Sequence, residues 1–255
     1  MRASGTLARD SSGTCAFYDE AERRCAIHAR LGRRALPASC AHFPRRLLIE
    51  DDRIAVSLSH YCPTVAGLLF DAAGGAEVVD APRLLDGFEV EGLDARGAWP
   101  PLLRPGVLAD ALSYRLWERA VVATLAAAEG GPEAALERAG AMTGEVVRWK
   151  PVKGRLEGWV AECAAAWQVP PKQERPAPGS WGGFDRAVGR YLAAKAFGNW
   201  TAYQGDGFSA VLQSVRRALD VLREEADAAH RPLDRLLLTE ALRQADLRLL
   251  HFPDA

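Results

Sequence analysis

Four of the five cysteines lie near the start of the chain, at Cys15, Cys25, Cys40 and Cys62. Thiolates bind zinc and iron–sulfur clusters, and four of them complete an all-cysteine ligand set for either. Their spacing, C-x9-C-x14-C-x21-C, lacks the close pairs of an ordinary zinc finger, and a proline follows Cys62, as at cluster ligands of ferredoxins. We therefore predict that these cysteines bind one metal centre, either zinc or a four-iron cluster. The alternative is four buried thiols that bind nothing.

Other residues in the same stretch could support such a centre. His28, His42 and His60 are three of the five histidines, and each could replace a thiolate or contact the ligands from outside. Arginines also crowd this stretch, where they either bind an anionic partner or offset the negative charge of a thiolate cluster. The fifth cysteine, Cys163, lies alone in an apolar helical stretch, and we expect it to be a packing residue. No motif identifies a catalytic residue.

The composition excludes several classes of partner. The chain has 255 residues and a formal net charge of −1, which argues against a bulk electrostatic attraction to nucleic acid or to an anionic membrane. No apolar run approaches the roughly 18 residues of a membrane-spanning helix, and the polar residues 1–14 do not resemble a secretory signal. We therefore expect a cytoplasmic protein with no nucleic-acid or membrane partner. Cytoplasmic thiols are kept reduced, so clustered cysteines there indicate metal ligands before disulfides.

The patterns around the cysteines predict short elements. Residues 25–31 are expected to form a helix that ends at Gly32, and Pro37 is expected to open a helix that carries Cys40. Residues 47–58 alternate around the polar turn 50–53, which predicts a β-hairpin whose buried face carries Ile54, Val56 and Leu58. A further helix is expected from Pro63 to about residue 70.

The rest of the chain has the periodicity of helices. Residues 80–104 are expected to form a connector with one short strand, and helices are expected at 105–128, 132–149, 152–167, 184–203, 207–229 and 232–250. The predicted fold is mainly α: a helical bundle over residues 81–255, joined to a small cysteine-cluster module over residues 1–80 that contains the hairpin.

The local sequence around the cysteines is similar to that of a known family. Residues 13–70 carry, in order, Cys15-Ala16-Phe17, Cys25-Ala26-Ile27-His28, Leu31-Gly32, Leu36-Pro37, Cys40-Ala41-His42-Phe43-Pro44-Arg45 and Cys62-Pro63. This order resembles the cysteine-cluster family of zinc- or iron-chelating proteins, whose best-known members are the flagellin lysine-N-methylases. Residues 191–203 and 236–251 also resemble the aromatic helix and the final helix of the methylases.

The resemblance implies a function as well as a ligand set. It implies that Cys15, Cys25, Cys40 and Cys62 hold a four-iron cluster or another metal. It also implies a surrounding shell that consists of His28, Phe43, Pro44 and Arg45. It further implies methyl transfer from S-adenosylmethionine to lysine side chains of a partner protein, with flagellin as the first candidate. The alternative is a non-catalytic zinc- or iron-binding module with a structural or interaction role.

This sequence departs from the family in one respect. Family members usually begin with a further cysteine-rich segment, which is missing before Cys15. Either the chain is shortened at its start, or this branch keeps a single four-cysteine set. The missing segment weakens the prediction of methylase activity more than it weakens the prediction of metal binding.

Overall fold

The computed structural model describes residues 8, 15–22, 24–71, 76–81, 90, 92–98, 100–167 and 181–251. The chain divides into two compact units, Met1–Phe43 and Pro44–Ala255. The sequence placed a boundary near residue 80, whereas this division places the hairpin and the helix that follows it in the same unit as the helical bundle. Cys15, Cys25 and Cys40 belong to the first unit, and Cys62 belongs to the second.

The first unit is built from very short elements. They are β1 (Tyr18–Asp19), β2 (Arg24–Cys25), α1 (Ala26–Leu31), the 3-10 turn η1 (Arg33–Ala35) and α2 (Ala38–His42). Strands β1 and β2 pair antiparallel, with Tyr18 opposite Cys25. Helix α1 ends as expected at Gly32, whose φ of 75° lies in the region that favours glycine.

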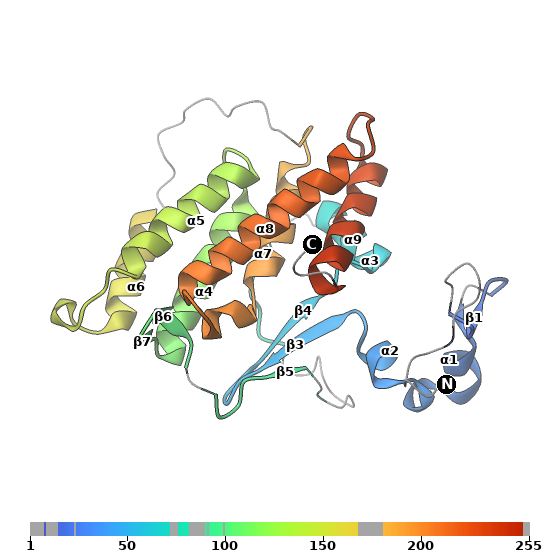
Figure 1. Cartoon of the computed structure of the whole chain (residues 1–255), viewed down its shortest axis with the longest axis horizontal. Coiled ribbons are helices and arrows are strands. Elements are labelled where there is room, and N and C mark those ends of the chain that lie inside the picture. The colour runs from blue at the N-terminus through green and yellow to red at the C-terminus, as the bar shows by residue number, and fades with distance from the viewer. Residues whose placement is uncertain are drawn as a thin grey trace. The chain divides into compact units, whose positions relative to one another are not determined.

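The second unit contains the remaining elements (Figure 1). Its strands are β3 (Arg45–Ile49), β4 (Ile54–Leu58), β5 (Leu93–Asp94), β6 (Leu102–Arg104) and β7 (Val107–Leu108). Its helices are α3 (Pro63–Asp71), α4 (Ala111–Ala127), α5 (Pro132–Val146), α6 (Leu156–Trp167), α7 (Asp185–Ala196), α8 (Phe208–Asp227) and α9 (Arg235–His251), with 3-10 turns η2 (Pro151–Lys153) and η3 (Trp200–Tyr203). The prediction of a mainly α fold is confirmed. No helix in the described part of the chain is both long enough and apolar enough to cross a membrane.

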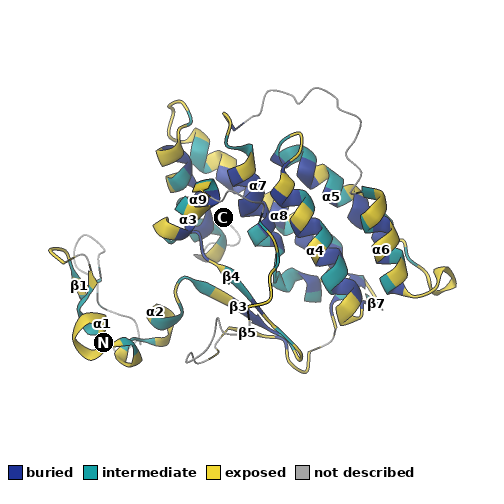
Figure 2. Cartoon of the chain, turned by 180° about the vertical axis from the view of Figure 1, so that it is seen from behind, coloured by how far each residue is buried: buried dark blue, intermediate teal, exposed yellow. Residues whose placement is uncertain are grey.

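Helix α4 lies at the centre of the bundle. It packs against α5, α6 and α7, while α8 packs against α5, α7 and α9, and α3 lies against α7 and α9. The buried faces of these helices point toward one another (Figure 2). The indole ring of Trp117 stacks on Phe208 with 4.2 Å between ring centroids, and its N–H donates to the hydroxyl of Thr143 at 3.0 Å. These contacts join α4, α5 and α8 in one core.

The start of α4 differs from the prediction. The sequence predicted a helix from residue 105, but β6 and β7 form a small antiparallel pair there, and α4 begins after Asp110. The carboxylate of Asp110 accepts the N–H of Ser113 at 2.9 Å and so caps the helix. Leu108 and Leu112 are consequently exposed, and the buried stripe of α4 follows Trp117 instead.

The hairpin β3–β4 forms where it was predicted, but its buried face is the opposite one. Leu48 pairs with Ala55, and both are buried against Phe197, Trp200 and Tyr203. Ile54 and Leu58, expected inside, are more than a third exposed. The small side chain of Ala55 permits this, because α7 ends and the chain turns at Gly198 directly above it.

Gly198 is expected to tolerate no side chain. Its φ is 60°, and a Cβ there would lie 3.1 Å from the Cβ of Ala55. We expect Gly198→Ala to lower the free energy of unfolding by about 1–2 kcal/mol, the cost of a left-handed backbone for a residue with a Cβ. The control is Gly144→Ala within α5, where a Cβ would meet nothing within 4 Å; it should stabilise by about 0.5–1 kcal/mol. Urea unfolding measures both, and equal shifts would contradict the assignment.

Candidate functional site

Three of the predicted ligands lie in the first unit. Cys25 ends β2 and precedes α1, Cys40 lies on α2, and Cys15 lies before β1, where its carbonyl accepts the N–H of Tyr18 at 2.8 Å. All three thiols are free; Cys40 is exposed, and the other two are partly buried. His28 lies on α1, and His42 is the last residue of α2. Cys25 lies at the end of a short element, as the sequence predicted, whereas Cys40 and His28 lie inside short helices.

The first unit has no hydrophobic core in the part that the structure describes. None of its described residues is buried (Figure 2), and three of its large apolar side chains are exposed. Leu31 is 71% exposed, Phe43 47% and Tyr18 43%. A unit of this size that buries so little apolar surface normally needs disulfides, a metal or association with a partner to fold. Its three cysteines form no disulfide, which makes a metal one of the remaining ways to stabilise it.

The fourth predicted ligand, Cys62, lies in the second unit at the start of α3. Its N–H donates to the carbonyl of Ser59 at 3.3 Å, and its own carbonyl accepts the N–H of Ala66 at 3.0 Å. Neighbouring His60 is 4% exposed, and its ring lies edge-on to Tyr191 with 5.2 Å between centroids. Burial, followed by the nearby cations Lys195 and Arg46, lowers the pKa of His60 to about 3. His60 is therefore neutral near pH 7.

The structure does not itself assemble a metal centre. Within the described ranges, no three cysteine, histidine or carboxylate side chains are grouped so that they could hold a metal ion. Arg45, assigned to the surrounding shell by resemblance, is the first residue of β3 and pairs with Leu58. The four-cysteine ligand set stays a prediction from the sequence. Cys163 is buried on α6, which agrees with a packing role.

A large cavity lies in the second unit between β4, α3, α4, α7 and residues 76–81. Its volume is about 820 Å³, within the range of sites that bind organic molecules. The walls are mostly apolar, and four arginines join them: Arg53, Arg115, Arg119 and Arg190. His60 also lines this cavity, and its Nδ1 atom is buried with no hydrogen-bond partner. Three carboxylate side chains, Asp52, Glu77 and Asp80, also line the cavity. The cavity therefore suits a mainly apolar molecule that also carries polar or charged groups.

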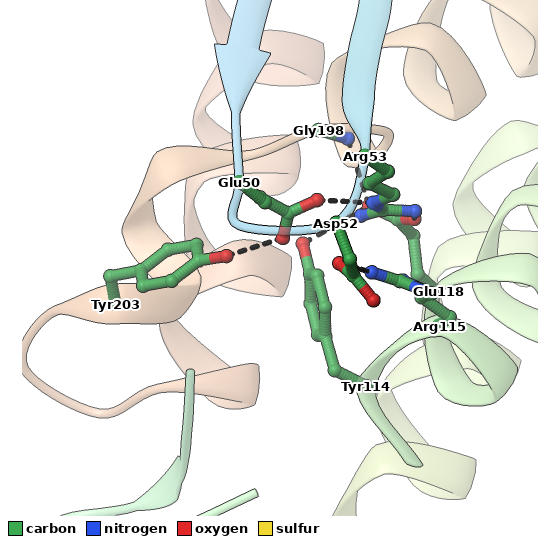
Figure 3. A network of polar contacts seen from close by, with 8 residues as sticks. All are labelled: Glu50, Asp52, Arg53, Tyr114, Arg115, Glu118, Gly198 and Tyr203. Atoms are coloured by element: carbon green, nitrogen blue, oxygen red, sulfur yellow. Dashed lines mark hydrogen bonds and ion pairs between the residues drawn. The ribbon is translucent and has the colours of Figure 1, made fainter. Parts of the chain in front are cut away.

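A buried ion-pair network stands beside this cavity (Figure 3). The carboxylate of Glu118 is fully buried on α4. It accepts hydrogen bonds from Arg53 Nη1 at 2.8 Å, from the hydroxyl of Tyr114 at 3.0 Å and from the N–H of Gly198 at 2.9 Å. Arg53 also pairs with Glu50. Although burial opposes the charge of Arg53, Glu118 and Glu50 together raise the pKa of its guanidinium.

The network holds the tip of the hairpin against the bundle. Glu50 precedes the turn and accepts a hydrogen bond from the hydroxyl of Tyr203 on η3. Arg115 on α4 pairs with Asp52 of the same turn. The sequence had indicated only a polar turn at residues 50–53, because it gives no sign of which charges meet partners from α4 and η3. The network therefore fixes one wall of the cavity.

No family model, no curated protein sequence and no solved structure matches this chain.

Proposed function

We propose that this chain binds a metal centre through Cys15, Cys25, Cys40 and Cys62, and that the metal folds the first unit. The observation that carries the proposal is the set of three free cysteines in a unit whose described residues include no buried side chain. Metal ligation supplies folding free energy to such units, because the ligands are brought together only in the folded state. A cytoplasmic location is part of the proposal, since reduced thiols are needed.

The proposed group is a four-iron cluster, with zinc as the alternative. Four thiolates suit either, and the resemblance to the cysteine-cluster family favours iron. An iron–sulfur cluster would supply redox chemistry or bind a donor molecule, whereas zinc in an all-cysteine site would contribute only to folding. The arginines of the first unit, such as Arg30 and Arg34, would offset the negative charge of the thiolates.

Anaerobic purification of the full chain distinguishes these metals. A brown protein with a broad absorption band near roughly 400 nm and about four irons per chain is expected for the cluster. A colourless protein with about one zinc per chain would assign the structural alternative. A colourless chain with neither metal, and with a folded first unit, would overturn the proposal.

The second candidate function is methyl transfer from S-adenosylmethionine to lysine side chains of a partner protein, with flagellin as the first candidate. The large cavity favours it, because its volume of about 820 Å³ admits a molecule of that size. Arg119 is an exposed cation at this cavity and a candidate partner for the donor's carboxylate. The competing proposal is a non-catalytic metal-binding module that recognises a partner protein.

Methyl transfer is tested with the full chain, labelled S-adenosylmethionine and purified flagellin. We expect label on flagellin lysines, detected by mass spectrometry. Arg119→Gln should weaken donor binding about ten- to hundredfold, the usual effect of losing a hydrogen bond between charged groups. Arg216→Gln, an exposed arginine on α8 outside the cavity, is the matched control. If the metal-loaded protein binds no donor and transfers no methyl group, methyl transfer is contradicted. The non-catalytic metal-binding module would then be the favoured function.

A further inference from the structure

A second, smaller cavity in the helical unit is lined by three cationic side chains. Its volume is about 330 Å³, and it lies among β3, α7, η3, α8 and α9. Arg46 comes from β3, Lys195 from α7 and Arg217 from α8. Among the described residues that line it, none is a carboxylate. Three segments that are far apart in the sequence therefore each contribute a cationic side chain to the lining of this cavity.

Lys195 shares its buried counter-ion with other donors. Its ammonium group pairs with Oδ1 of Asp246, whose side chain is fully buried. The other oxygen of Asp246 accepts the hydroxyl of Ser59 at 2.7 Å and the N–H of Tyr61 at 3.3 Å. The Lys195 ammonium also lies 5.2 Å from the centre of the Tyr191 ring. Asp246 thus compensates Lys195 from behind the cavity wall, since it does not itself line the cavity.

Arg46 brings a second positive charge close to Lys195. The side chain of Arg46 is exposed, yet the surrounding protein removes enough water to lower the pKa of its guanidinium. Burial, and after it the charge of Arg46, lowers the pKa of Lys195, while the buried carboxylate of Asp246 opposes this shift and keeps the group an ammonium. Two positive charges repel each other more strongly where little water screens them. An anion bound beside both would offset this electrostatic repulsion.

We propose that this cavity binds a small phosphorylated molecule, with the phosphate held by Arg46 and Lys195. A guanidinium binds two phosphate oxygens at once and an ammonium acts as a compact point charge, so the pair suits a phosphate group. A phosphate monoester carries close to two negative charges at neutral pH and offers three acceptor oxygens, whereas a carboxylate carries one charge. This inference is independent of the metal and of methyl transfer.

The remaining walls indicate the kind of molecule that carries the phosphate. Phe197, Trp200, Leu93 and Leu249 line the cavity and are apolar. Asn199, which also lines the cavity, donates to the hydroxyl of Ser214 at 2.8 Å and accepts the hydroxyl of Thr201 at 2.7 Å. A volume near the lower limit of ligand cavities excludes large cofactors. The ligand is therefore a phosphate ester of a small, partly apolar group.

Isothermal titration calorimetry with the full chain tests this site, using phenyl phosphate, inorganic phosphate and benzoate as probes. Phenyl phosphate is expected to bind more tightly than the other two. Arg46→Gln should weaken it about ten- to hundredfold, and Arg46→Lys should restore part of the loss. Arg216→Gln should leave binding unchanged, since Arg216 is exposed on α8 and does not line the cavity.

Arg46 is preferred for substitution because its side chain is exposed, while removing Lys195 would leave Asp246 buried without its cation. The melting temperature of each variant confirms that it is folded. Binding of benzoate as tight as that of phenyl phosphate would overturn the choice of phosphate. Unchanged affinity in Arg46→Gln, or no heat of binding with millimolar phenyl phosphate, would overturn the site.

Discussion

Removing the proposed metal from the full chain by chelation is expected to unfold residues 24–43 and to leave the helical unit folded. Structural zinc supplies about 10–16 kcal/mol of apparent binding free energy in small cysteine-rich units, which is as large as the net stability of about 5–15 kcal/mol of an ordinary domain. No described side chain of the first unit is buried, so nothing in that part compensates for its loss. The second unit has its own core, in which Trp117, Leu125 and Leu222 are at most 1% exposed.

Hydrogen–deuterium exchange, read peptide by peptide, measures this effect. Peptides from residues 24–43 should exchange within seconds after chelation and should regain protection when the metal is returned. Peptides from α4 and α8 serve as internal controls and should keep their protection. Residues 24–43 that stay protected in metal-free protein would show that the first unit folds without metal.

Replacing Glu118 with alanine is expected to destabilise the helical unit by about 3–5 kcal/mol, the cost of breaking a buried ion pair by removing one partner. Three donors lose their acceptor: Arg53 Nη1, the hydroxyl of Tyr114 and the N–H of Gly198. Among the described residues, Glu50 would remain as the carboxylate paired with Arg53. Because the network anchors the hairpin tip, the large cavity should also lose one wall.

The matched control for Glu118 is Asp52→Asn, which removes the charge of another carboxylate that pairs with an arginine at the same hairpin tip. The side chain of Asp52 is 59% exposed and pairs with Arg115. An exposed pair contributes about 0–1 kcal/mol, so this variant should unfold almost like the wild type. Urea unfolding at neutral pH compares the two. Equal effects of both substitutions would contradict the assignment of Glu118 as the buried centre of the network.

Helices that bury a simple apolar stripe could be predicted from the sequence. The spacing of Val211, Val215, Leu219 and Leu222 places one face of α8 toward the core, and all four are buried. This works because the helical period alone decides which side chains share a face. The mainly α fold follows from several such stripes.

The start of α4 and the orientation of the hairpin could not be predicted in the same way. The four-residue step from Leu108 to Leu112 suggested a helix, but the cap at Asp110 begins α4 later and leaves both leucines exposed. In the hairpin, Ala55 rather than Ile54 is buried, because the close approach of Gly198 leaves room for only a small side chain. Tertiary contacts decided both cases.

The cavities and the ion-pair network depend on contacts between distant segments. Glu118 stands in the sequence beside arginines and resembles an exposed helix charge, yet its partner Arg53 is 65 residues away. Arg46, Lys195 and Arg217 likewise show no common pattern in the sequence. Cysteines, by contrast, are rare and chemically distinctive, so their clustering could be recognised without any structure.

Metal content of five single-cysteine variants, purified anaerobically as full chains, tests the ligand assignment most directly. Cys15→Ser, Cys25→Ser, Cys40→Ser and Cys62→Ser should each lose most of the bound iron or zinc. Cys163→Ala, which removes the buried thiol of α6, should keep the wild-type content. Wild-type metal content in all four serine variants, or no metal in any of the proteins, would contradict a metal centre formed by these cysteines.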